Sequence, residues 1–98
     1  MEHIEINGTT YPFKAAYSVL RKAMRLNEQM NGTEIDLMHL MCVESINKGY
    51  KLEGKLDTMT AELLDDLIDQ DPKALNRMSE MVEKQQKTEG GSAEVGGK

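Results

Sequence analysis

The chain has 98 residues, a length that suits one domain with one modest hydrophobic core. Its 12 basic and 17 acidic residues leave a net charge of −5 at pH 7. This balance argues against a nucleic-acid-binding module, because such modules carry a positive footprint. With no tryptophan, one phenylalanine and three tyrosines, the core must be built from aliphatic residues and from the eight methionines.

The single cysteine, Cys42, cannot form an internal disulfide, and it lies in the apolar run Leu40–Val43, where we expect it to pack as a small hydrophobic residue. This cysteine usage is typical of a reducing, intracellular compartment. The N-terminal residues show no basic segment followed by an apolar stretch, so no signal peptide is expected. No apolar run approaches the roughly 20 residues that span a bilayer, so no membrane association is expected.

Residues 3–13 are predicted to form a short β-hairpin. Ile4 and Ile6 alternate with polar neighbours, and the Asn7-Gly8 pair that follows accepts the positive φ angles of a tight turn. Because a two-stranded ribbon is marginally stable alone, its apolar residues are expected to pack on helices.

Four helices are predicted to follow the hairpin, from their apolar periodicity and their start and stop signals. The first two span residues 14–30 and 33–47, the third begins after Thr58 or Thr60, and the fourth runs from Asp71-Pro72 to about residue 87. The predicted fold class is therefore mainly α. A short N-terminal β-hairpin and the four helices that follow form one domain over residues 1–87, and the glycine-rich residues 88–98 form a disordered tail.

The second predicted helix carries apolar residues on two sides. One stripe consists of Ile35, Met38, Cys42 and Ile46, and the other consists of Leu37, Leu40 and Met41. A helix that is apolar nearly all round is either the central helix of a core or a helix with one face reserved for a partner. Both interpretations remain open at this point, and both can hold together.

The first predicted helix has a broad apolar face and an opposite face with the basic residues Lys14, Arg21, Lys22 and Arg25. Phosphate binding by this stripe is conceivable, but no aromatic residues lie between the basic ones to stack on bases. We therefore predict a solvated face, or one that meets the acidic second half of a neighbouring subunit, and no nucleic-acid partner.

His39 and Cys42 lie three residues apart and would share a helix face. Such a pair could be a nucleophile and its general base, or two ligands of a zinc ion. Zinc needs three or four ligands, and the only other histidine is His3. The acidic stretch DDLIDQDPKALN has lysine and alanine where a calcium loop needs a ligand and a glycine, which argues against calcium. We expect no metal, no cofactor and no enzymatic activity.

Residues 2–70 combine, in order, a short strand, an ING turn, the segment YPFKAAYSVLRKAMRLNEQMNG, a second apolar helix and the helix TMTAELLDDLID. A loose tail follows. This order resembles that of phage tail assembly chaperones, small helical proteins encoded just ahead of the tape measure protein in long-tailed phages and prophages. The resemblance implies a protein that coats the apolar helices of the tape measure protein, keeps them soluble until tail-tube subunits replace them, and self-associates.

On this interpretation the protein binds without catalysis in the cytoplasm of a bacterial host cell. The partner is the tape measure protein or another phage tail protein. Partner-binding residues are predicted on the spare stripe of the second helix and on part of the first helix's apolar face: Leu37, Leu40, Met41, Val19, Leu26 and Met30. The alternative is a small intracellular protein-binding regulatory module unrelated to virion assembly.

Overall fold

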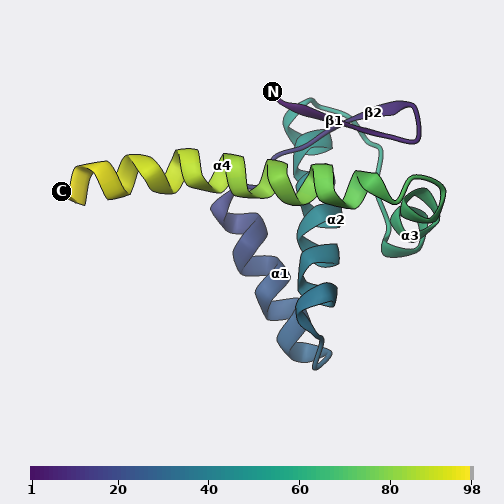
Figure 1. Cartoon of the computed structure of the whole chain (residues 1–98), viewed down its shortest axis with the longest axis horizontal. Coiled ribbons are helices and arrows are strands. Elements are labelled where there is room, and N and C mark those ends of the chain that lie inside the picture. Colours follow the sequence, from purple (N-terminus) through teal and green to yellow (C-terminus); the bar gives the residue numbers. More distant parts are fainter. Residues whose placement is uncertain (98) are drawn as a thin grey trace.

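The computed structural model describes the backbone of residues 1–97 and the side chains of residues 1–86. It confirms a mainly helical protein with a short antiparallel hairpin at its N-terminus (Figure 1). The elements, in chain order, are β1 (His3–Ile6), β2 (Thr9–Pro12), α1 (Tyr17–Gln29), α2 (Glu34–Leu52), α3 (Ala61–Gln70) and α4 (Lys73–Gly97).

The hairpin turn is the predicted one: Asn7 and Gly8 have φ angles of 49° and 82°. Ile4 and Ile6 are buried, and β1 packs on α4 while β2 packs on α2. The turn is held by a residue between α3 and α4, since the Asn7 backbone N–H donates to Asp71 Oδ2 at 2.9 Å. Arg77 donates both to the Glu5 carbonyl and to the same Asp71 oxygen. Asp71, predicted to start the fourth helix, therefore also fastens the hairpin to α4.

Local capping places the starts of α2 and α3 as predicted. Thr33 and Asp36 form a reciprocal capping box, in which Thr33 Oγ1 accepts from the Asp36 N–H at 3.2 Å and Asp36 Oδ2 accepts from the Thr33 N–H at 2.9 Å. Of the two candidates for the third helix, Thr60 is the cap, because its hydroxyl oxygen accepts from the Leu63 N–H at 3.1 Å. Asn31, after α1, has a φ angle of 51°, as a helix-to-helix corner requires.

The predicted end of the second helix near residue 47 is wrong, because α2 continues to Leu52. Gly49 does not terminate the helix. A Cβ atom at this position would lie 2.7 Å from the carbonyl carbon of Pro12, so glycine is the residue that lets β2 approach α2 closely. The helix ends instead before Gly54, which has a φ angle of 72°.

The hydrophobic core draws residues from every element and centres on residues 41–49 of α2. Its fully buried side chains include Phe13, Cys42, Ile46, Leu64 and Met78. Buried Gln85 of α4 completes this region: its Oε1 accepts from the Ala15 N–H at 2.6 Å, and its Nε2 donates to the Phe13 carbonyl at 2.9 Å. The amide therefore satisfies one N–H and one carbonyl of the segment that joins β2 to α1.

Helix α4 crosses α2 instead of running alongside it, and then extends beyond α1 (Figure 1). It continues to Gly97, past the expected end near residue 87. The predicted disorder of residues 88–98 falls where no side chain is described, and Lys98 lies outside the described residues, so this disorder stays a prediction.

Candidate functional site

The face of α2 that carries Leu37 and Met41 is turned towards α1. Leu37, Met41, Glu44 and Lys48 recur at the three- and four-residue intervals of one helix face. Glu44 on this face pairs with Lys22 of α1, with Oε1 and Nζ 2.9 Å apart. The stripe predicted to be spare is therefore the one against which α1 packs.

The six residues predicted to bind a partner consequently differ in their availability. Val19 and Met41 are only 4% and 6% exposed, so the expectation that they lie on an open surface is wrong; they belong to the core of this chain. Leu26, Leu37 and Leu40 are half-buried, whereas Met30 is 57% exposed. A partner-binding role for these last four residues stays a prediction.

An open apolar groove lies on a different side of α2. It has a volume of about 480 Å³ and is formed by the N-terminal half of α2, by α3 and by the first turns of α4. Its apolar lining consists of Ile35, Met38, Ile68 and Leu75. Its polar lining consists of Glu34, Asp36, His39, Asp65, Asn76 and Ser79. Ile35 is 77% exposed, so the groove offers apolar surface that a bound side chain would remove from water.

Short-range contacts position the walls of this groove. The capping box described above holds the first turn of α2, including the Asp36 carboxylate. His39 Nε2 lies 2.8 Å from Asp65 Oδ1, which joins α2 to α3. Leu64 anchors α3 in the core, and Ile68, one turn later, reaches the groove. The groove is thus a consequence of how α3 and α4 meet the projecting end of α2.

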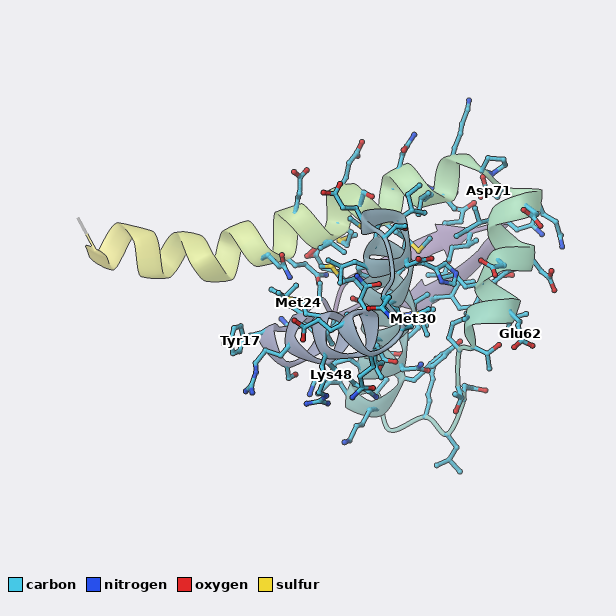
Figure 2. The ribbon with its side chains drawn as sticks, turned by 90° about the horizontal axis from the view of Figure 1, so that it is seen from below. Tyr17, Met24, Met30, Lys48, Glu62 and Asp71 are labelled. Carbon is cyan, nitrogen blue, oxygen red and sulfur yellow. The ribbon has the colours of Figure 1, made fainter. Side chains whose placement is uncertain are left out.

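The groove is acidic. Glu34, Asp36 and Asp65 are among its lining residues, and none of the lining residues that the structure describes is a lysine or an arginine. Glu62 and Asp66 are also exposed on α3, and Figure 2 shows Glu62 and Asp71 on this side of the molecule, away from Tyr17 of α1. Three carboxylates therefore place negative charge along the open apolar surface.

A basic surface lies elsewhere, where α1 meets the C-terminal half of α2. Two shallow hollows there are lined by Lys22, Lys48, Lys51 and Lys55. Part of this charge is used inside the chain, because Lys22 pairs with Glu44. Arg21 of the predicted basic stripe lies 5.9 Å from the centre of the Tyr17 ring.

Helix α1 also exposes apolar side chains, but along a convex surface. Tyr17 and Met24 are 69% and 51% exposed, and Figure 2 shows them with Met30 along this helix. A convex row gives a ligand less contact than a groove, because side chains surround the ligand on one side only. We therefore take the groove as the main candidate site.

The residues weighed for chemistry are placed as follows. Cys42 is fully buried, as expected of a small hydrophobic residue, and burial raises the pKa of its thiol to about 12. Within the part of the chain that the structure describes, no group of three or more histidine, cysteine, aspartate or glutamate side chains is placed to hold a metal ion. No helix among the described residues is both long and apolar enough to cross a bilayer.

The groove is not predicted as a site from the sequence, although two of its apolar residues, Ile35 and Met38, are predicted to share a helix face. Ile35 and Met38 were assigned to one stripe with Cys42 and Ile46, and only the latter two are fully buried. No signal in the sequence separates Ile35 and Met38 from Cys42 and Ile46, because all four recur at the intervals of one helix face.

No protein-family model matches the chain, and neither a curated protein nor a solved structure matches it.

Proposed function

We propose that this protein is a phage or prophage tail assembly chaperone that binds helices of a tape measure protein and keeps them soluble in the bacterial cytoplasm, without catalysis. The resemblance over residues 2–70 motivates the proposal. The observation that carries it is the open apolar groove between α2, α3 and α4. Self-association, which the resemblance also implies, is part of the proposal and is measured as the mass of the protein in solution.

A groove of this kind suits a helix better than an extended segment. An amphipathic helix presents apolar side chains at positions i, i+3, i+4 and i+7, which can dock into a row of apolar residues. Ile35 and Met38 supply such a row on α2, and Ile68 and Leu75 face it from α3 and α4. Methionine adapts its shape to different partners, which suits a chaperone whose client offers many similar helices.

The proposal is tested by co-expressing the chain with the long helical protein that the resemblance places just downstream in the genome. The Ile35→Asp variant should reduce co-purification about tenfold or more, because a bound helix would then have to bury a carboxylate in the apolar lining of the groove. Since Ile35 is largely exposed and lies in the first turn of α2, where an aspartate is favourable, the helical circular dichroism signal should be retained.

The matched control is Met24→Asp, which places the same charge on exposed α1 outside the groove. It should leave co-purification unchanged. Undiminished co-purification with the Ile35→Asp variant would exclude the groove as the binding site. Loss with Met24→Asp alone would place the site on α1.

A regulatory module that binds a host protein remains the second candidate, since the same groove suits any helical partner. The neighbouring genes separate the two candidates. A tail-tube gene upstream and a long helical gene downstream are expected for the chaperone, whereas their absence favours the regulatory module.

A further inference from the structure

We propose that the groove selects amphipathic helices whose apolar face is flanked by lysine or arginine. This inference rests on the proposed function, in that it takes the groove to bind a helix, and adds the chemistry by which one helix is preferred over another.

The carboxylates of the groove lie close to its apolar lining. Glu34 and Asp36 lie on either side of Ile35 in the sequence, and Asp65 lies three residues, close to one helical turn, before Ile68. A helix whose apolar side chains reach Ile35 and Ile68 therefore brings its flanking residues close to carboxylates at two points.

The negative charge of these carboxylates is only partly compensated inside the chain. Asp36 accepts hydrogen bonds from Thr33, and Asp65 contacts His39. Backbone and hydroxyl donors carry no full charge, so the Asp36 carboxylate still presents a negative charge to the groove. Glutamate or aspartate flanks on a bound helix would meet like charges as water is displaced, which is costly.

The walls of the groove differ in charge. The α4 wall contributes the neutral Asn76 and Ser79, whereas the carboxylates come from α2 and α3. A preferred helix therefore carries its positive charge on the flank that faces α2 and α3, and uncharged polar residues suffice on the other flank. Such complementary charge also accelerates the association of the helix with the groove, and this acceleration is larger at low salt.

The experiment uses the full chain and three labelled helical peptides with identical leucine faces and with lysine, glutamine or glutamate flanks. Binding is measured by fluorescence anisotropy. We expect the lysine peptide to bind about tenfold more tightly than the glutamate peptide at about 50 mM salt, and this ratio to shrink severalfold at about 500 mM. The double variant Glu34→Gln with Asp65→Asn should reduce the ratio, whereas Glu5→Gln, at an exposed carboxylate of β1 outside the groove lining, should leave it unchanged.

A further variant separates groove binding from general attraction to an acidic chain. Ile35→Asp adds negative charge but removes an apolar side chain from the groove lining, so it should weaken binding of the lysine peptide. Undiminished binding to this variant would overturn the inference, because attraction to the net charge would then explain it. Equal affinity for all three peptides would overturn the charge selectivity while the proposed function stands. If none of the peptides binds, the groove does not accept helices and the proposed function fails as well.

Discussion

Helix α2 has an open half, residues 34–40, and a closed half, residues 41–52, and the two have opposite environments. All six of its buried residues, Met41, Cys42, Val43, Ser45, Ile46 and Gly49, lie in the closed half. Residues 34–40 contain no buried residue, and Ile35 among them is largely exposed. Both halves are nevertheless apolar in sequence, so the difference comes from what packs against them.

The polar contacts follow the same division. Around the closed half, Gln85 satisfies the β2–α1 segment, and Asn47 pairs with both backbone groups of Met59 at 2.7 and 2.9 Å. Around the open half, the polar groups that line the groove include the carboxylates of Glu34, Asp36 and Asp65. The closed half therefore specifies the fold, and the open half retains surface for a partner.

The sharpest test of this comparison is one substitution made in both halves of the helix. Ile46→Ala should lower the free energy of unfolding by about 3 kcal/mol, because it leaves a cavity where a fully buried side chain was. Ile35→Ala should change it by less than about 0.5 kcal/mol. Urea unfolding measures both, and equal losses would show that the two halves are equally packed.

The second test removes the buried amide that closes the core beside α4. Gln85→Leu leaves the Ala15 N–H and the Phe13 carbonyl without their partner, which should cost about 2 kcal/mol. The control is Gln29→Leu at an exposed position of α1, which should cost almost nothing. An unaltered unfolding midpoint for Gln85→Leu would mean that water replaces the amide and that this segment is open.

A smaller effect is expected from pH, through the contact between the hairpin and the start of α4. The hydrogen bond from the Asn7 N–H, and then the Arg77 guanidinium, hold the pKa of Asp71 below its ordinary value of 3.8, against partial desolvation. Because the pKa is lower in the folded state, the carboxylate stabilises the fold fully above pH 3.8, and this contribution is lost as the pH falls through the folded-state pKa.

The Asp71→Asn variant should therefore show a weaker rise of unfolding free energy with pH in this acidic range than the unaltered chain. Urea titrations at a series of acidic pH values measure the slope. An identical slope for the two proteins would assign the acid sensitivity to other carboxylates, such as Glu2 and Glu53, whose pKa values are also lowered.

Features set by neighbours in the chain were readable from the sequence. The Asn7-Gly8 turn, the Thr33–Asp36 capping box and the Thr60 cap each depend on residues within three positions of one another. The end of α2 was not readable from the sequence. A glycine near the end of an apolar pattern usually marks the end of a helix, but Gly49 lies inside α2, where it makes room for the distant residue Pro12.

The sequence by itself determined that the chain is mainly helical, where its hairpin turns, and that its second helix has more apolar surface than one neighbour can cover. Only the tertiary structure decided which part stays open: α1 packs against the stripe of Leu37 and Met41, and α4 crosses the helix without covering the groove beside Ile35. The physical reason is that hydrophobic burial has no direction. A periodic pattern indicates that a helix face is covered, and the identity of the covering element depends on contacts between distant segments.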